Sequence, residues 1–302
     1  MNSSVRTRAA VVGNPIAHSL SPQLHTAGWN AVNFTKIELP AAGLASFLQE
    51  CDDSWAGIAV TMPLKYEAVK AADIVDGLAK AVGSANTIVF QPTGANSRLC
   101  VAFNTDVAGI VNAIRESTET VRFQRGVILG SGATASSALA AMVELGVADI
   151  TVCARRAGGP NTVFAAAHRL HLDLQYLPLE SIQCAQRIAE SDLVISTLPA
   201  HIADPIARQL KKLSFADSAE NASGTAPLAG KVLLDVIYDP SPTELMSAWE
   251  SAHGTVAPGW LMLLHQAIDQ ARLFTGKMPD VSAMRSALRK ALAERDAFRW
   301  KN

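Results

Sequence analysis

Short runs of apolar, often β-branched residues alternate along the chain with longer segments whose apolar positions recur at helical spacing. The clearest of these runs are residues 11–12, 58–61, 87–90, 127–129, 150–153, 193–196 and 232–235. Uniformly apolar strands separated by helical segments are typical of a parallel sheet that helices cover on both faces. The pattern therefore predicts an α/β fold.

The runs fall into two groups, which predicts two domains. The first three runs form one group and the last four form the other. The turn at 104–106 and the helical segment 107–114 carry the chain between the groups, so we place the first boundary after residue 106. Residues 215–230 are rich in Ala, Ser, Gly and Asn, which predicts a loop. Residues 261–275 and 281–293 predict two amphipathic helices near the C-terminus.

The composition fits a globular enzyme and excludes other classes. A chain of 302 residues is long enough for two domains of about 150 residues. Its 49% hydrophobic and 18% charged residues exclude general disorder. With 26 basic and 27 acidic residues the net charge is −1, so no overall basic field favours a nucleic acid or an anionic membrane. No apolar run approaches the roughly 18 residues of a transmembrane helix.

The cysteines and the N-terminus indicate a cytoplasmic location. Cys51, Cys100, Cys153 and Cys184 are far apart, with no CxxC and no histidine at ligand spacing. Neither a disulfide framework nor a metal site is expected, and a reducing compartment fits. Residues 1–8 lack the apolar stretch of a secretory signal.

A glycine-rich turn follows the run at 127–129. Its sequence, Gly130-Ser131-Gly132-Ala133-Thr134-Ala135, has the form GxGxxA and leads into an Ala-rich helical segment, 136–145. In such turns the first glycine permits the tight bend, the second lets the backbone approach a pyrophosphate, and the small last residue allows close packing. The helix N-terminus adds N–H groups and a partial positive charge. The turn therefore predicts a dinucleotide site.

The end of the next strand distinguishes NADP from NAD. Sites for NAD usually carry Asp or Glu there to bind the ribose 2′-hydroxyl, whereas arginine suits a 2′-phosphate. The strand 150–154 ends in Arg155-Arg156, and the nearest acid, Asp149, lies at its beginning. Because two guanidinium groups can bind one phosphate, the sequence favours NADP.

In the first domain, polar residues follow the ends of apolar strands, where open α/β sheets bind ligands. In segment 13–22, Ser19 and Ser21 are two residues apart, so both hydroxyls face one side of an extended loop. Ser21 precedes Pro22, which predicts an N-cap serine and a helix beginning at the proline. Two hydroxyls beside a helix N-terminus can hold a small carboxylate.

A lysine follows the strand at 58–61, in the first turn of a predicted helix, where negative charge is favoured. If Pro63 is the first residue of the next helix, Lys65 lies in its first turn. A cation there opposes the helix dipole, and residues that break a local rule are often functional. Lys65 is therefore a candidate acid–base group.

Two polar turns, Asn86-Thr87 and Asn104-Thr105-Asp106, complete the candidate residues. Taken singly, Asn86 fits an ordinary turn and Asp106 an ordinary N-cap. Taken with Lys65 and the two serines, they supply a cation, a carboxylate, amides and hydroxyls at strand ends. That set suits a small polyhydroxy acid as substrate.

In these segments the chain resembles the shikimate dehydrogenase family over essentially its whole length. The pattern Gly-x-Pro-Ile-x-His-Ser-x-Ser-Pro-x-x-His is met by Gly13, Pro15, Ile16, His18, Ser19, Ser21, Pro22 and His25. The pattern Val-Thr-x-Pro-x-Lys is met by Val60, Thr61, Pro63 and Lys65. The two polar turns match as well, and the last two family motifs correspond to residues 235–240 and 259–266.

The resemblance implies an NADP-dependent oxidoreductase that reduces 3-dehydroshikimate to shikimate in aromatic amino-acid biosynthesis. It implies Lys65 and Asp106 as the catalytic pair and Ser19 and Ser21 as the carboxylate site. The remaining substrate contacts would be Thr61, Asn86, Tyr238 and Gln266. The cofactor contacts would be the turn 130–135, Arg155, Arg156 and Gly259.

The resemblance also assigns the domains and the partners. Residues 1–106 would form the substrate-binding and catalytic domain and residues 107–258 a Rossmann domain. The helices of residues 259–302 would pack back on the first domain. The partners would be small molecules only, and the protein would be a monomer or a homodimer.

Some residues depart from the family pattern, and some alternatives stay open. Ala154 replaces an Asn before the cofactor arginine, and Arg156 replaces a Thr, which adds a cation. Elsewhere, Ala59 and Thr26 replace Asn, and Ala102 replaces Gly.

The alternatives are an NAD-dependent quinate/shikimate dehydrogenase, a non-catalytic NADP-binding regulator, and a fold relative such as methylenetetrahydrofolate dehydrogenase. Arg155 and Arg156 disfavour the NAD-dependent enzyme, and the presence of Lys65 and Asp106 disfavours the non-catalytic regulator. The serine pair gives no reason to expect the fold relative.

Overall fold

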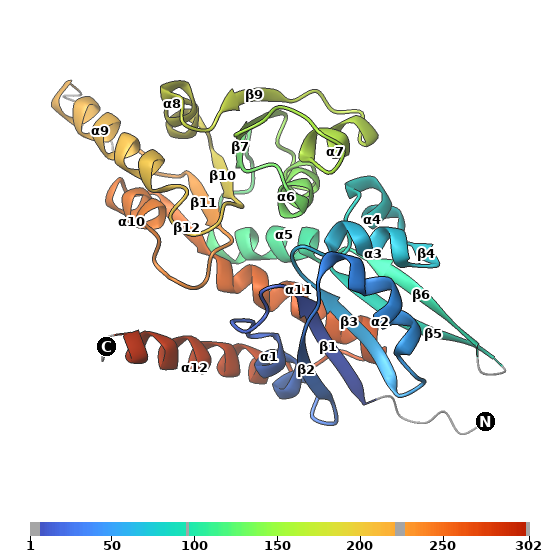
Figure 1. Cartoon of the computed structure of the whole chain (residues 1–302). Helices are drawn as coiled ribbons and strands as arrows, with labels where there is room; N and C mark the ends of the chain where they lie inside the picture. The colour runs from blue at the N-terminus through green and yellow to red at the C-terminus, as the bar shows by residue number, and fades with distance from the viewer. Residues whose placement is uncertain (1–6, 95–96, 221–226, 300–302) are drawn as a thin grey trace. The chain divides into compact units, whose positions relative to one another are not determined.

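The computed structural model describes residues 7–94, 97–220 and 227–299, and it divides into two compact units (Figure 1). The first unit consists of residues 1–105 together with 264–302, and the second of residues 106–263. In the part of the chain that the structure describes, each unit is built around one six-stranded sheet.

The sheet of the first unit mixes parallel and antiparallel strands in the order β2-β1-β3-β5-β6-β4. The strands are β1 (Arg8–Gly13), β2 (Asn33–Glu38), β3 (Trp55–Val60), β4 (Ile74–Val75), β5 (Thr87–Gly94) and β6 (Ser97–Phe103). Strand β5 is antiparallel to β3 and to β6, whereas the other pairs are parallel. The expectation of a purely parallel sheet is wrong here. Only two residues separate β5 from β6, and strands joined so closely pair as antiparallel neighbours.

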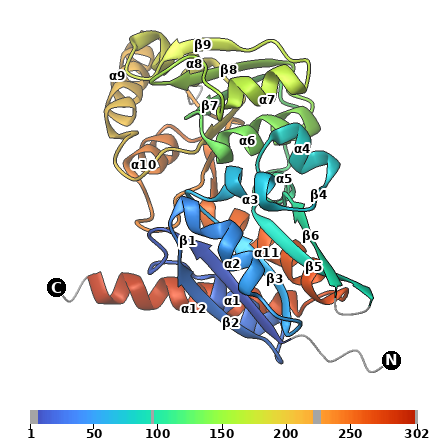
Figure 2. The same cartoon turned by 45° about the vertical axis from the view of Figure 1, so that its right-hand side comes forward.

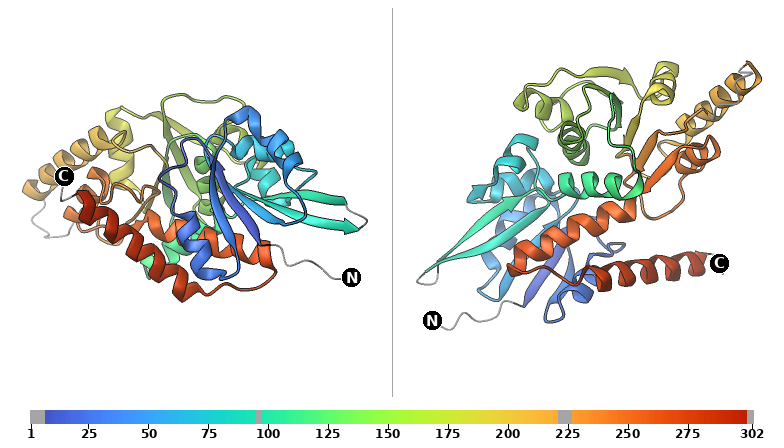
Figure 3. Two further views of the ribbon diagram at one scale, coloured as in Figure 1. Left: turned by 60° about the horizontal axis from the view of Figure 1, so that its bottom comes forward. Right: turned by 180° about the vertical axis from the view of Figure 1, so that it is seen from behind.

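Helices cover both faces of this sheet because its central strands are apolar on both sides. In β1, Ala10 and Val12 pack into the cluster that includes residues of α2 and α3, while Ala9 and Val11 pack with Phe274 of α11. Helix α12 lies beside α1 (Figures 2 and 3). The helices here are α1 (Ser21–Gly28), α2 (Leu44–Glu50), α3 (Lys65–Ala71), α4 (Gly77–Val82), most of α11 (Gly259–Thr275), α12 (Val281–Arg299) and a 3₁₀ turn, η1 (Ala41–Gly43).

The sheet of the second unit is entirely parallel, as predicted, in the order β9-β8-β7-β10-β11-β12. Its strands are β7 (Arg125–Leu129), β8 (Asp149–Ala154), β9 (Gln175–Pro178), β10 (Leu193–Ser196), β11 (Val232–Asp235) and β12 (Thr255–Pro258). This is the strand order of a doubly wound dinucleotide-binding fold. The order reverses between β7 and β10, which is where such sheets bind their ligands.

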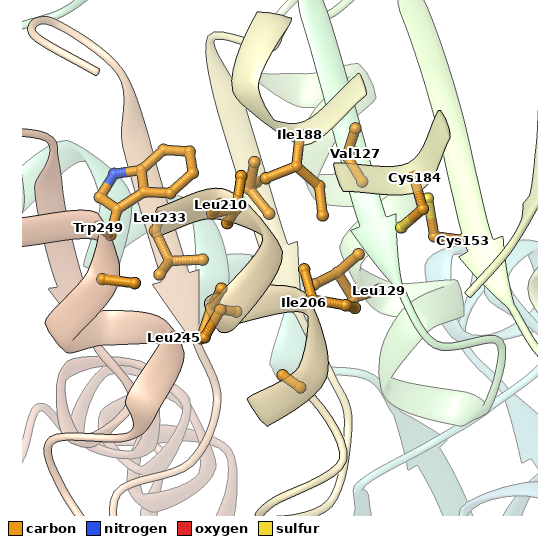
Figure 4. Close-up of a cluster of buried hydrophobic side chains, with 14 of the residues drawn as sticks. Val127, Leu129, Cys153, Cys184, Ile188, Ile206, Leu210, Leu233, Leu245 and Trp249 are labelled. Carbon is orange, nitrogen blue, oxygen red and sulfur yellow. The ribbon is translucent and has the colours of Figure 1, made fainter. Parts of the chain in front are cut away.

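Helices α8, α9 and α10 cover one face of this sheet over a buried apolar cluster (Figure 4). Trp249 of α10 is the largest fully buried side chain of the cluster, and Figure 4 shows it near Leu233 of β11. Cys153 and Cys184 are adjacent free thiols in the same cluster. The helices of the unit are α5 (Asp106–Ser117), α6 (Ala133–Glu144), α7 (Val163–Arg169), α8 (Ile182–Glu190), α9 (Asp204–Glu220) and α10 (Glu244–Ser251).

Several helix boundaries differ from the prediction. Helix α9 includes residues 215–220, which were predicted to be loop, because its apolar positions Ile206 and Leu210 anchor the helix in the core. The rest of the predicted loop up to residue 226 lies outside the described residues. Helix α1 begins at Ser21, so Ser21 is the first helical residue and not the N-cap.

The start of α3 and the edge strands also differ from the prediction. Helix α3 begins at Lys65 rather than at Pro63, and α5 begins at Asp106 itself. The strands that the pattern did not predict are β2, β4, β6, β9 and β12. All of these except β6 lie at a sheet edge. An edge strand buries less of its surface, so its sequence need not be uniformly apolar.

Candidate active site

Most of the predicted substrate residues lie at one end of the strands of the first sheet, where β1 and β3 finish. Strands β1 and β3 are parallel and end there, at Gly13 and Val60. Because β5 is antiparallel to β3, it starts at the same edge, and β6 ends there. The segments that hold Ser19, Thr61 and Asn86 therefore all leave the sheet on one side. The topology brings together residues that are far apart in the sequence.

Asn86 is the centre of a buried polar cluster at this edge and is only 2% exposed. Its Oδ1 accepts hydrogen bonds from the backbone N–H of Thr105 at 2.8 Å and from the Thr87 hydroxyl at 3.0 Å. Its Nδ2 donates to Thr105 Oγ1 at 2.9 Å. An amide whose hydrogen bonds are all supplied by its surroundings is held in one orientation. The two polar turns thus form one site.

Helix α11 adds two buried glutamines, one turn apart, to this cluster. Gln266 Oε1 accepts a hydrogen bond from Asn86 Nδ2 at 3.2 Å. Gln270 Nε2 donates to the backbone oxygen of Asn86 and to Thr87 Oγ1, both at 3.1 Å. The sequence analysis did not single out Gln270. Its i,i+4 spacing from Gln266, on the same helix face, is the signal that points to it.

Lys65 and Asp106 are each tied to the neighbourhood of Asn86 through the backbone. The Lys65 carbonyl accepts from the Ala85 N–H at 2.9 Å, which places the first turn of α3 beside the residue before Asn86. Asp106 follows Thr105 directly and is buried, whereas Lys65 is half-buried. Lys65 belongs to the first unit and Asp106 begins the second. Their direct pairing stays a prediction.

The segment 13–22, which we call the serine loop, accepts hydrogen bonds from two cations. Ser19 Oγ donates to Ser21 Oγ at 3.2 Å, so the two hydroxyls lie together. Lys36 Nζ donates to the backbone oxygen of Ala17 at 2.6 Å, and Arg295 Nη2 donates to that of His18 at 2.8 Å. Burial, and secondarily the charge of Arg295, lowers the pKa of Lys36. Both positive charges therefore lie at the backbone of the serine loop, close to residues 17 and 18.

In the second unit, the glycine turn after β7 fits a bound phosphate. Gly130 has a φ of +106°, and a Cβ there would lie 2.5 Å from Thr197 Oγ1, so this position requires glycine. A Cβ on Gly132 would meet nothing within 4 Å, so the backbone there borders open space. Helix α6 begins at Ala133, and its N-cap residue, Gly132, has no side chain that could cap it. A helix N-terminus with an approachable backbone suits a dinucleotide phosphate.

The two arginines lie on the same side of this sheet as the glycine turn. Strands β7 and β8 are parallel neighbours, so Arg155 and Arg156, just after β8, leave the sheet at the edge where Gly130 does. Both side chains are exposed. Asp149 is at the opposite end of β8 and forms an ion pair with Arg187. The end of β8 that adjoins the glycine turn is thus followed by two cations, and Asp149 lies at the other end of the strand.

Tyr238 and Gly259 also belong to the second unit. Tyr238 is half-buried in the segment that follows β11. A Cβ on Gly259 would lie 2.6 Å from the backbone oxygens of Asp235 and Val236. This close approach explains, by packing alone, why the first residue of α11 is glycine. The contact of Gly259 with the cofactor stays a prediction.

Asp235 is a buried acid that ends strand β11 and holds the Tyr238 segment. Its carboxylate accepts from the backbone N–H of Ile237 at 3.2 Å and from the Thr243 hydroxyl at 2.9 Å. Burial raises the pKa of Asp235 to about 6, against 3.8 for an ordinary aspartate, because these hydrogen bonds only partly offset the loss of water. The carboxyl therefore titrates close to neutral pH.

We expect Asp235→Asn to change how stability depends on pH. Because the folded pKa is the higher one, the wild type loses stability as pH rises from about 4 to about 6, and that loss persists above pH 6. An asparagine does not titrate. The free energy of unfolding of Asp235→Asn, relative to that of the wild type, should therefore rise by roughly 2 kcal/mol between pH 4 and pH 7. Urea unfolding of both proteins at these pH values measures the difference. A constant difference across this range would contradict the raised pKa.

Among the residues that the structure describes, no group of three or more His, Cys, Asp or Glu side chains is placed to hold a metal ion. Nor does any helix within the described ranges have the length and apolar character needed to cross a membrane.

Comparison with family models gives two matches. The model described as "Shikimate dehydrogenase substrate binding domain" matches residues 11–88. The model described as "Shikimate 5'-dehydrogenase C-terminal domain" matches residues 259–289. The first match contains Ser19, Ser21, Lys65 and Asn86, and the second contains Gln266.

The chain is similar to proteins of one family along nearly all of its length. It shares 36% identity with the crystal structure of shikimate dehydrogenase from Mycobacterium tuberculosis, with a TM-score of 0.75, over 94% of this chain and 99% of that one. Against shikimate 5-dehydrogenase from Thermus thermophilus in complex with NADP(H) and shikimate, identity is 26% and the TM-score 0.73, over 94% and 99% of the two chains. The pentafunctional AROM polypeptide of Scheffersomyces stipitis is 30% identical over 88% of this chain. The present chain spans only 17% of that longer relative.

Proposed function

This chain belongs to the shikimate dehydrogenase family, and on that premise we propose that it interconverts 3-dehydroshikimate and shikimate with NADP(H). The reaction is a step of aromatic amino-acid biosynthesis. The observation that carries the proposal is the buried polar cluster around Asn86, at the sheet edge where Thr61 and the serine loop also lie. Amides and hydroxyls fixed in one orientation suit a ring that carries several hydroxyls. The related structure from Thermus thermophilus holds shikimate and NADP(H).

Lys65 and Asp106 are the proposed catalytic pair. Bound NADPH would supply the hydride. The glycine turn at 130–132 and the arginines at 155 and 156 would hold the cofactor. Hydride transfer to a ketone builds negative charge on its oxygen, which a positioned cation or acid stabilises. We assign that role to the Lys65 ammonium, with Asp106 balancing its charge and accepting a hydrogen bond from a ring hydroxyl.

The serine loop is the proposed carboxylate site. Ser19 and Ser21 offer two adjacent hydroxyls, and Lys36 and Arg295 place positive charge at the backbone of the same loop. Hydrogen bonds from these two side chains to the backbone oxygens of residues 17 and 18 would hold the loop so that the two hydroxyls stay together. The positive charges favour an anionic ligand over a neutral one.

Replacing both cations, as Lys36→Met with Arg295→Met, should raise KM for shikimate by roughly three- to tenfold and leave kcat within about twofold, because only binding is affected. Steady-state kinetics at two salt concentrations measures this. The wild-type KM should rise with salt more than that of the variant. Lys290→Met is the matched control, since Lys290 is an exposed cation on the same helix. An equal effect of the control would refute the role of the pair.

A spectrophotometric assay with shikimate or quinate, each with NADP or NAD, tests the proposed function. We expect the highest kcat/KM with shikimate and NADP. Faster oxidation of quinate with NAD would identify the protein as a quinate dehydrogenase. Binding of NADPH without turnover of either acid would identify a cofactor-binding regulator.

The compartment and the assembly belong to the same proposal. We place the enzyme in the cytoplasm, which suits its four free cysteines and a soluble nucleotide cofactor. We propose a monomer or a homodimer with small-molecule partners and no nucleic acid. Sedimentation at micromolar concentration distinguishes the two assemblies.

A further inference from the structure

The two arginines of the proposed cofactor site lie on a loop that leaves the end of β8 and leads into α7. We call residues 155–162 the arginine loop. Six of its eight residues are exposed, and its two glycines, Gly158 and Gly159, have φ values of +100° and +125°. A loop with so little buried surface is not held in place by the packing of its own side chains. The contacts at its two ends therefore decide where the arginines lie.

The start of the arginine loop is anchored at the backbone oxygen of Ala154. This oxygen accepts hydrogen bonds from the Leu179 N–H at 3.1 Å and from the Tyr176 hydroxyl at 3.2 Å. A carbonyl oxygen has two lone pairs, so the two donors satisfy it. The Ala154 carbonyl and the Arg155 N–H belong to one planar peptide group. The tyrosine hydroxyl thus helps to fix the direction in which the chain enters Arg155.

The end of the arginine loop is anchored to the glycine turn and to the same tyrosine. The N–H of Val163, which is buried, donates to the backbone oxygen of Ser131 at 3.0 Å. The next residue, Phe164, packs against the Tyr176 ring, with 6.0 Å between the ring centroids and an interplanar angle of 68°. Aromatic rings in such a tilted arrangement attract each other. Tyr176 therefore contacts both ends of the arginine loop.

The position of Tyr176 on β9 explains how one side chain reaches both ends. Strand β9 is an edge strand that pairs with β8, and Tyr176 lies opposite Val152 in that register. Its hydroxyl reaches two residues further along β8, to the carbonyl of the last residue of the strand. The ring alone would suffice for packing on Phe164. The contact with Ala154 is what requires tyrosine rather than phenylalanine.

The position of the arginine loop affects one part of the cofactor selectively. Guanidinium groups bind a phosphate through hydrogen bonds of defined direction, so their backbone has to be in place. NADP carries a 2′-phosphate and NAD does not, whereas both carry the diphosphate that we assign to the glycine turn. Displacement of the arginine loop should therefore weaken the binding of NADP more than that of NAD.

We propose that Tyr176 is a positioning residue that holds the arginine loop at both ends and thereby places Arg155 and Arg156 for the 2′-phosphate of NADP. The inference rests on the proposed function, since it specifies how the assigned cofactor residues are held. Tyr176 does not itself touch the cofactor in this assignment. It acts through the backbone of Ala154 and the ring of Phe164.

Trypsin tests the loop directly, because it cleaves after arginine in exposed segments that can open. Without cofactor, Tyr176→Phe, which loses only the hydroxyl, should speed cleavage after Arg155 or Arg156 about fivefold. Tyr176→Leu also loses the contact with Phe164 and should speed cleavage at least about tenfold. Gln175→Ala, at the exposed neighbour on β9, is the matched control and should stay within about twofold. Mass spectrometry of the fragments identifies the cleavage site.

Calorimetric titration with NADP and with NAD, in the absence of substrate, gives the second readout. The Kd for NADP should rise about threefold in Tyr176→Phe and about tenfold in Tyr176→Leu. The Kd for NAD should stay within about twofold in both variants. Gln175→Ala should bind both cofactors as the wild type does.

Each outcome decides the matter. A wild-type Kd for NADP in both Tyr176 variants, or a wild-type rate of cleavage in both, would overturn the inference. So would an equal loss of affinity for NADP and NAD, because Tyr176 would then support the cofactor site as a whole. Should Tyr176→Leu fail to show a cooperative thermal unfolding transition, Tyr176→Phe carries the test alone.

Failure of the proposed function would look different. A wild type that binds NAD as tightly as NADP would refute the role assigned to Arg155 and Arg156. The cleavage rates would still decide whether Tyr176 holds the arginine loop.

Discussion

Replacing Lys65 with alanine is expected to lower kcat by at least about a hundredfold while KM for NADP stays nearly unchanged. The ammonium is the group that we assign to protonate or stabilise the substrate oxygen, so its loss acts on the transition state. Lys65 is the first residue of α3, and its carbonyl is bound by Ala85, which ties its position to the Asn86 cluster. Stopped-flow measurement of NADPH consumption separates the chemical step from product release.

Lys80→Met is the matched control for this result. Lys80 is an exposed lysine on α4 of the same unit, and its replacement should leave kcat within about twofold. Turnover of Lys65→Ala at the wild-type rate would show that another group stabilises the oxygen. Asp106→Asn should also lower kcat, since it removes the charge that balances the lysine.

Removing both arginines after β8, as Arg155→Ala with Arg156→Ala, should raise KM for NADP by roughly thirtyfold and leave KM for NAD within about twofold. Each guanidinium can make charge-assisted hydrogen bonds to the 2′-phosphate, and NAD lacks that group. The exposure of both side chains limits the effect, because water and salt screen exposed charges. Initial rates with each cofactor give the ratio directly.

Arg122→Ala controls for the loss of positive charge from the second unit. Arg122 is exposed and comes before β7, outside the 130–156 segment that contains the glycine turn and the two arginines. Arg122→Ala should change neither the KM for NADP nor the KM for NAD. If the double variant lost affinity for NAD and NADP alike, the arginines would serve the fold or the shared pyrophosphate rather than the 2′ position.

Much of the fold could be predicted because uniformly apolar strands signal burial on both faces. That signal found the four inner strands of the second sheet and correctly made this sheet parallel. It failed at edge strands such as β2 and β9, which bury less surface. It also failed for the direction of β5, because apolar character does not encode whether a strand runs parallel or antiparallel to its neighbour.

The candidate site was predictable only where a residue broke a local rule or formed a short motif. Lys65 at a helix start and the glycine turn at 130–132 are of that kind. Gln270 is not. A buried glutamine on an amphipathic helix has the sequence signature of an ordinary polar position, so only its contacts reveal what it holds.

By itself, the amino-acid sequence determined the residue types for the chemistry and the α/β class, because short motifs and apolar periodicity are local properties. It also indicated the preference for NADP, since Arg155 and Arg156 adjoin the strand that they follow. Only the tertiary structure decided that residues 86, 105, 266 and 270 form one hydrogen-bonded cluster. It also decided which way each amide points. Both depend on strand direction and on backbone donors distant in the chain, and neither is encoded in any single segment.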